Sequence, residues 1–132
     1  DFVIGSKEAK YGYPVHRIGI SPAVTIPTLF QKLGEGRART LILSGEIIDG
    51  SDANAIGLLS HLEETDEQAI ITANELAEAL AQKPAIALQA TKRWLNELDG
   101  SLDDERFDKP AKQSSSALGD ETEKMLNQLW NK

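Results

Sequence analysis

Few side chains in this sequence could transfer a proton or bind an anion. Cysteine is absent, and the histidines are His16 and His61. His16 lies in a segment rich in glycine and proline, residues 11–22, and its imidazole could act as a proton shuttle near neutral pH. Arg17 beside it could pair with a phosphate group. The commoner role for a residue such as His16 is that of a surface histidine or one behind the site, which does not reach a substrate. The commoner role for Arg17 is that of a solvated charge on a loop.

The other group of titratable side chains is an acidic cluster near residue 100. Carboxylates at this density could bind a hard cation such as Ca²⁺, but a solvated acidic face is the more typical role. The lack of cysteine rules out disulfides and thiolate metal sites, and two histidines do not support a histidine-rich site. We therefore predict no metal site. The cluster consists of Asp99, Asp103, Asp104, Glu105 and Asp108.

Composition narrows the class of protein further. The 132 residues make one domain or part of one, with 40% hydrophobic and 27% charged residues. The formal charge of −7 argues against nucleic-acid binding, because there is no basic stripe to neutralise phosphates. We see no signal peptide and no apolar run long enough to span a bilayer, and so expect a cytoplasmic protein without a membrane partner.

The first half of the chain is predicted to alternate short extended segments with helices. Pro27 is tolerated in a first helical turn, Gly34 ends that helix, and Ser51 is the expected N-cap of a brief helix whose C′ residue is Gly57. The punctuated residues 18–22 indicate a loop. Extended segments are expected at residues 2–4, 9–11, 46–49 and 58–62, and helices at residues 27–33, 37–43 and 51–56.

The second half is predicted to be helical. Thr65 and Gln68 form a capping-box pattern, and an apolar stripe at helical spacing follows. Pro84 suits a helix start, Gly100 ends that helix, and residues 120–130 form a last amphipathic helix. Residues 109–116, with proline and serines, are predicted to be a loop. The stripe comprises Ala69, Ile70, Ala73, Leu76, Ala77 and Leu80.

The start of the chain resembles an apolar strand without a lead-in. Residues 1–6 would pair in a sheet, yet the sequence offers few other strands. We therefore expect a fragment of a longer protein. A few strands followed by many helices fit an α+β layout or the helical end of an α/β one.

Ordered motifs along the chain resemble the crotonase superfamily, the enoyl-CoA hydratase/isomerase family, over its C-terminal half. Residues 1–6 and 9–12 are similar to the family's Cys-Asp strand and the Ala-x-Phe-Gly element after it. Pro14 with residues 18–22 is similar to its Pro-Glu, Leu-Gly and Pro segment. Each motif alone is weak, and it is their order and spacing that carries the resemblance. Two further motifs match, at residues 44–58 and at residues 84–94, which include Lys92.

The resemblance implies an α/β fold of the ClpP/crotonase type, a spiral of ββα units. Residues 1–62 would be the end of the spiral core, and residues 63–132 a helical C-terminal region used for trimerisation. It implies a homotrimer or a hexamer built as a dimer of trimers. Exposed apolar helix faces and the two tryptophans of the sequence fit such contacts.

The resemblance also implies an acyl-CoA enzyme of fatty acid metabolism, a lyase or isomerase. The CoA thioester would be the substrate, and no separate cofactor is expected. Two backbone N–H groups of the family form an oxyanion hole for the thioester oxygen, which stabilises enolate-like charge. Both come from segments that would precede Asp1, as does one of the two hydratase glutamates. This chain alone would not complete the site.

The family's second glutamate directly follows the proline equivalent to Pro14, and that position is Val15 here. Valine cannot transfer protons, so two-carboxylate hydration should be altered or lost. His16 is the nearest titratable substitute, although a residue directly after a site position normally points elsewhere. An alignment slip is the other explanation. The alternatives to a hydratase are an isomerase or decarboxylase and a non-catalytic scaffold subunit.

The resemblance also assigns the binding residues. Tyr13, Pro22, Ala23 and Val24 would contact the acyl part of the substrate, and branched residues in place of the family's glycine-rich run predict either a reshaped acyl pocket or plain core packing. Lys124 and Trp130 would contact CoA, with Lys132 as a further phosphate contact. Trp94 and Trp130 could equally be core or interface anchors.

Overall fold

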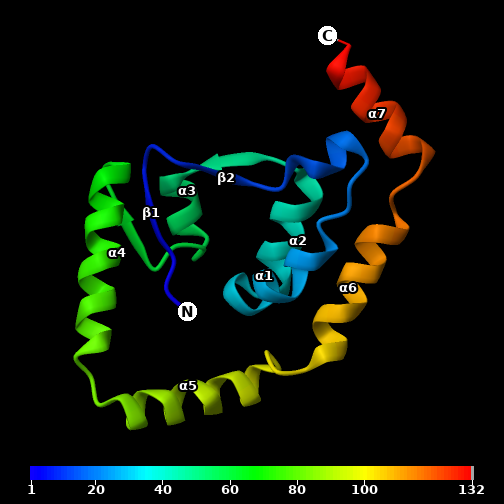
Figure 1. The fold of residues 1–132 in the computed structure, drawn as a ribbon. Coiled ribbons are helices and arrows are strands. Elements are labelled where there is room, and N and C mark those ends of the chain that lie inside the picture. The colour runs from blue at the N-terminus through cyan, green and yellow to red at the C-terminus, as the bar shows by residue number, and fades with distance from the viewer. Residues whose placement is uncertain (132) are drawn as a thin grey trace. The chain divides into compact units, whose positions relative to one another are not determined.

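The computed structural model describes residues 1–131, with the side chains of Asp104 and Phe107 excepted. The chain forms two compact units (Figure 1). Unit 1 comprises Asp1–Tyr11 and Ile48–Leu102, and unit 2 comprises Gly12–Ile47 and the chain from Asp103 onward. The chain leaves unit 1 within strand β2, Lys10–Gly12, and returns to it within β3, Ile47–Asp49. These two strands form one of two small sheets.

Unit 1 is built on the parallel pairing of β1, Ile4–Ser6, with β4, His61–Glu63. Ile4 lies opposite His61, and Ser6 lies opposite Glu63. Strand β1 begins at Ile4, two residues later than predicted. The reason is that Gly5 and Ser6 are the buried positions, whereas Phe2 is exposed. A Cβ on Gly5 would overlap the hydroxyl of Tyr11, so glycine lets the tyrosine side chain lie against the strand.

The brief helix α3 spans Gly50–Ala55, and its cap corrects the sequence prediction. Asp49, not Ser51, is the N-cap, and its carboxylate accepts a 2.9 Å hydrogen bond from the N–H of Asp52. Asp49 keeps the extended backbone of β3, so the helix can begin at the next residue. Gly57 follows with φ of 86°, which confirms the predicted C′ glycine.

Helix α4, Asp66–Ala81, lies alongside β1 (Figure 1). Thr65 caps it by accepting a 3.3 Å hydrogen bond from the N–H of Gln68, as predicted. The predicted stripe is only partly correct, because Ile70 and Ala77 are exposed. The half-buried positions in the helix include Ala69, Thr72, Ala73, Leu76 and Leu80.

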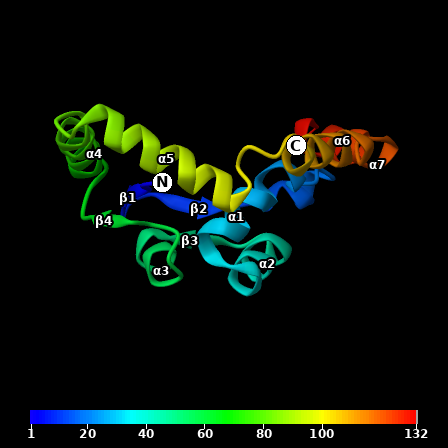
Figure 2. The ribbon, with the colours of Figure 1, turned by 90° about the horizontal axis from the view of Figure 1, so that it is seen from below.

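Helix α5, Ala85–Asp99, follows α4 after a short turn (Figure 2). Pro84 precedes its first turn, and Gly100 ends it with φ of 73°, as predicted. The helix is exposed along nearly its whole length, and Trp94 is 59% exposed. The interpretation of Trp94 as a core residue is therefore wrong for the described chain, while its role as an interface anchor stays a prediction. Lys92 of α5 forms an ion pair with Asp1.

Unit 2 has a helical core. The 3-10 helices η1, Pro14–Ile18, and η2, Ala23–Thr25, lead into α1, Ile26–Leu33, and α2, Glu35–Ser44. Gly34 separates α1 from α2 with φ of 73°, and Gly45 ends α2 with φ of 61°. The stop at Gly34 agrees with the sequence prediction. The buried apolar side chains of these helices are Ala23, Leu29, Leu33, Ala38, Leu41 and Ile42.

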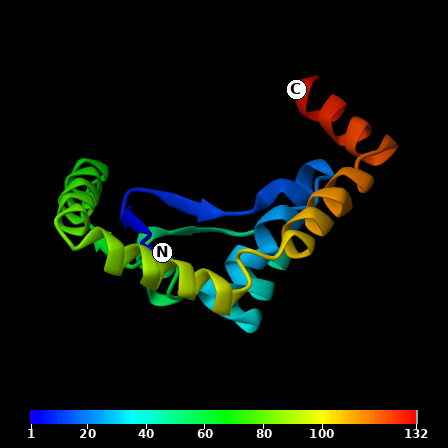
Figure 3. The same cartoon turned by 60° about the horizontal axis from the view of Figure 1, so that its bottom comes forward.

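Two C-terminal helices complete unit 2, namely α6, Asp104–Ser116, and α7, Asp120–Trp130. The predicted loop at residues 109–116 is wrong, because α6 runs through Pro110. Packing of α6 against η2 and α1 outweighs the helix-breaking tendency of the proline (Figure 3). Helix α7 has the predicted bounds. Trp130 is 81% exposed and is not a core residue.

Within residues 1–131, no helix is long and apolar enough to cross a membrane.

Candidate substrate-binding site

Six of the predicted site residues lie in one segment of unit 2, residues 13–24. Tyr13 precedes η1, and Pro14 opens it at a position where its missing N–H costs nothing. Gly19 closes η1 in the left-handed conformation, with φ of 70°. Its N–H donates to the carbonyl of His16 at 3.1 Å, and the N–H of Ile20 donates to that of Val15 at 3.1 Å. The segment is therefore an ordered turn, although only a loop was predicted for residues 18–22.

The side chains of η1 differ in their exposure. Val15 is half-buried, while His16 and Arg17 are exposed. Arg17 donates a 3.2 Å hydrogen bond from Nη2 to the carbonyl of Gly45, which ties η1 to the end of α2. Arg17 is therefore an exposed charge, as one of the two predicted roles requires, and one of its N–H donors is occupied by this hydrogen bond.

A pocket of about 260 Å³ lies beside η2, between it and α6. Ala23 belongs to its lining, and both Ala23 and Pro22 are buried. Val24 is 52% exposed and is not among the lining residues. The sequence does not point to the lining residues from α6, because residues 109–116 are predicted to be a loop. The pocket is lined by Ala23, Ile26, Pro27, Lys109, Pro110 and Gln113.

Two hydroxyl groups of the C-terminal helices hold the link between η1 and η2. Thr122 of α7 donates through Oγ1 to the carbonyl of Gly19 at 2.8 Å. Ser114 of α6 donates through Oγ to the carbonyl of Ser21 at 2.8 Å. Thr122 is only 5% exposed, so its hydrogen bond is protected from solvent. Neither hydroxyl was singled out in the sequence, because nothing local distinguishes it.

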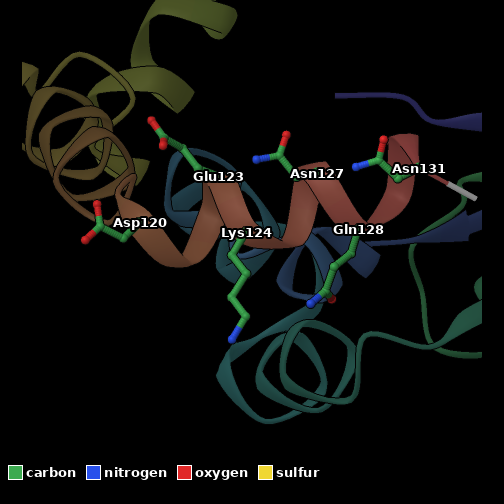
Figure 4. Close-up of a pocket in the computed structure, with 6 residues that line it drawn as sticks. All are labelled: Asp120, Glu123, Lys124, Asn127, Gln128 and Asn131. Carbon is green, nitrogen blue, oxygen red and sulfur yellow. The ribbon is translucent and has the colours of Figure 1, made fainter.

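The predicted CoA contacts lie on α7 (Figure 4). Lys124 and Gln128 extend from one side of the helix, while Glu123 and Asn127 extend from the other. A hollow of about 520 Å³ runs along these side chains. Helix α7 contacts η1, and Thr122 in its first turn bonds to Gly19 next to η1. Lys132 lies outside the described residues.

The segment 13–24 carries few groups that could transfer a proton. In the segment 13–24 the titratable side chains are those of Tyr13, His16 and Arg17, and the last two are exposed. Among the described side chains, which exclude that of Asp104, no three histidines, aspartates or glutamates are grouped closely enough to hold a metal ion. The described site offers an apolar pocket, a half-buried valine and cations at its surface.

The model of the enoyl-CoA hydratase/isomerase family matches residues 1–121. The chain belongs to this family, as the motif order predicted.

Curated relatives carry consistent names. A putative enoyl-CoA hydratase from Thermus thermophilus is 32% identical over 100 residues, covering 76% of this chain and 39% of that protein. A probable enoyl-CoA hydratase from Rhizobium meliloti is 32% identical over 130 residues, covering 95% and 49%. A mitochondrial Delta(3,5)-Delta(2,4)-dienoyl-CoA isomerase from Dictyostelium discoideum is 29% identical over 119 residues, covering 89% and 41%. The chain thus spans less than half the length of these relatives.

Solved structures show the same fold. An enoyl-CoA hydratase/isomerase from Pseudoalteromonas atlantica superposes with a TM-score of 0.88 at 22% identity, covering 99% of this chain and 53% of that one. A carnitinyl-CoA dehydratase from Mycobacterium avium superposes with a TM-score of 0.80 at 23% identity, covering 93% and 50%. The crotonase-like fold is therefore shown, in a part that is mostly helical with few strands.

Proposed function

We propose that the whole protein binds acyl-CoA thioesters and stabilises enolate-like charge on the thioester oxygen. The observation that carries this proposal is the family match across residues 1–121, together with the ordered turn at residues 13–24. The oxyanion hole would come from two backbone N–H groups in residues preceding Asp1. Preorganised donors of this kind are typically the largest contribution to such catalysis.

In this proposal the segment 13–24 contacts the acyl part of the substrate. The pocket beside Ala23 holds about 260 Å³, which is just below the usual range for ligand sites and fits a short acyl group rather than a whole acyl-CoA. Lys124, exposed on α7, would pair with a phosphate of the CoA moiety. CoA is then a part of the substrate, and no separate cofactor is required.

Calorimetry on the whole protein tests this function. Butyryl-CoA should bind with a dissociation constant in the micromolar range, and free CoA should bind more weakly. Lys124→Ala should weaken both, whereas Lys112→Ala on α6 serves as the matched loss of an exposed helical lysine. Absence of binding heat with butyryl-CoA and with longer acyl-CoAs would refute the proposal.

Val15 supports a reaction other than two-carboxylate hydration as the second candidate. The half-buried side chain at this position cannot exchange protons, and isomerisation or decarboxylation needs one acid/base group or none. A relative bearing the isomerase name agrees with this reading. A non-catalytic scaffold subunit is the remaining alternative. Turnover across a panel of acyl-CoAs separates the two, because a scaffold would bind without converting any of them.

Assembly and location are further parts of the proposal. The whole protein would be a cytoplasmic homotrimer, or a dimer of trimers, acting in fatty acid metabolism. Residues 1–62 would close the spiral core, and residues 63–132 would supply the helical trimerisation region. The exposed apolar side chains of α5, including Trp94 and Leu98, support such contacts. Light scattering that finds a stable monomer would contradict the trimer.

A further inference from the structure

The link between η1 and η2 is held from the C-terminal side of unit 2 by two side chains. The carbonyls of Gly19 and Ser21 accept from Thr122 and Ser114, each at 2.8 Å. The acceptors are two residues apart, and the donors come from different helices, α7 and α6. The link is thus fixed at two points rather than resting on a single contact.

The contact at Gly19 is unusually close. A Cβ on Gly19 would lie 3.0 Å from the α-carbon of Thr122, so glycine lets the backbone of α7 approach the turn. Gly19 also has a positive φ of 70°, which a side chain would strain. Thr122 is 5% exposed, and water therefore cannot readily replace its hydroxyl. The burial of Thr122, its close approach to Gly19 and its hydrogen bond all place α7 against the turn at Gly19.

We propose that Thr122 and Ser114 are positioning residues that set the conformation of the substrate-contact segment 13–24. Thr122 holds Gly19, which ends the short helix η1 that contains Val15. Ser114 holds Ser21, which directly precedes Pro22 and Ala23. This inference rests on the proposed function in one respect, namely that the segment 13–24 contacts the substrate. Losing either hydroxyl loosens the turn without removing any group that touches the acyl chain.

Hydrogen exchange on the whole protein tests the positioning directly. Thr122→Val keeps the size of the side chain and removes the hydroxyl. Exchange of the Gly19 and Ile20 amides, which close η1, should then rise about 3- to 10-fold, as expected for one hydrogen bond of typical net strength. Thr122→Ser should restore protection. The matched control is Thr91→Val, since Thr91 bonds only to Ala87 within its own exposed helix.

Acyl-CoA affinity is the second readout. Thr122→Val and Ser114→Ala should each raise the dissociation constant for butyryl-CoA by about 3-fold or more, with Thr122→Ser close to the parent. Unchanged exchange at Gly19 and Ile20, or an equal rise throughout α1 and α2, would overturn the proposal. Raised local exchange with unchanged affinity would overturn it too, because the role would then be structural only. If the parent binds no acyl-CoA, the proposed function fails, and the exchange data still decide whether the two hydroxyls hold the turn.

Discussion

Gly50, the first residue of α3, packs directly against the carbonyl group of Ser6 at the end of β1. A Cβ on Gly50 would overlap the carbonyl oxygen of Ser6 and would lie 2.8 Å from the α-carbon of Lys7. Both atoms are backbone atoms and cannot rotate away. The start of α3 and the end of β1 therefore require glycine for steric reasons.

Gly50→Ala should lower the free energy of unfolding by about 2–3 kcal/mol, because the new methyl group displaces backbone in unit 1. Urea denaturation measures the change. Gly36→Ala is the matched control, since Gly36 lies inside α2 with open space around its α-carbon. There the substitution should stabilise by about 0.5–1 kcal/mol through helix propensity. Equal effects of the two substitutions would contradict the steric explanation.

Ser6→Ala should destabilise unit 1 by about 1–3 kcal/mol. The Ser6 side chain is 1% exposed, donates to the carboxylate of Asp66 and accepts from the N–H of Ala9 at 3.1 Å. The substitution leaves the half-buried amide of Ala9 without this acceptor. Ser116→Ala provides the comparison, because that exposed hydroxyl bonds only within its own helix turn. A denaturation midpoint unchanged in Ser6→Ala would show that the buried hydroxyl is dispensable.

Val15→Glu should raise the hydration rate of crotonyl-CoA in the whole protein by at least about 100-fold over the parent. The position is half-buried, and a carboxylate there would supply the second glutamate of the arrangement that the resemblance implies. Val15→Gln has the same shape without the proton-transfer group. Hydration measured by loss of enoyl absorbance should therefore increase only in the glutamate variant. Similar rates in the two variants, or rapid hydration by the parent, would show that this position is not an acid/base site.

Leu98→Glu on α5 should lower the oligomeric state of the whole protein. Leu98 is 66% exposed and belongs to an apolar surface with Trp94 and Leu95, where an interface would bury it. A glutamate there would lose its hydration in the assembly, which is costly. Size-exclusion chromatography with light scattering measures the mass. Gln89→Glu adds the same charge to the same helix outside this group, and an equal loss of mass in that variant would point to charge alone.

The sequence predicted the elements whose ends carry strong local signals. Gly34 and Gly100 ended helices where expected, and the acidic first turn with regularly spaced apolar residues placed α7 correctly. The prediction of Ser51 as the cap of α3 is wrong, because Asp49 is an equally good capping residue and local propensity does not separate the two. The extended backbone of Asp49, which continues β3, makes it the cap.

The failures came from contacts between segments far apart in the chain. Helix α6 contains Pro110 and three serines, so local propensity indicates a loop, and only packing against η2 and α1 makes it helical. The same reason explains why Thr122 escaped notice, since its partner Gly19 lies 103 residues away. The motif spacing placed Val15, Pro22 and Ala23 in one segment. It carried no information on the helices that hold that segment.

The order of synthesis gives the hydrogen bonds of Thr122 and Ser114 a further meaning. Residues 12–47 leave the ribosome well before α6 and α7, while all of unit 1 is complete once Leu102 has emerged. Domains generally fold as they are made, from the N-terminal side. The turn at Gly19 and Ser21 must therefore wait, with its carbonyls solvated, until the C-terminal helices arrive. Residues 13–24 are consequently among the last parts of this chain to reach their final form.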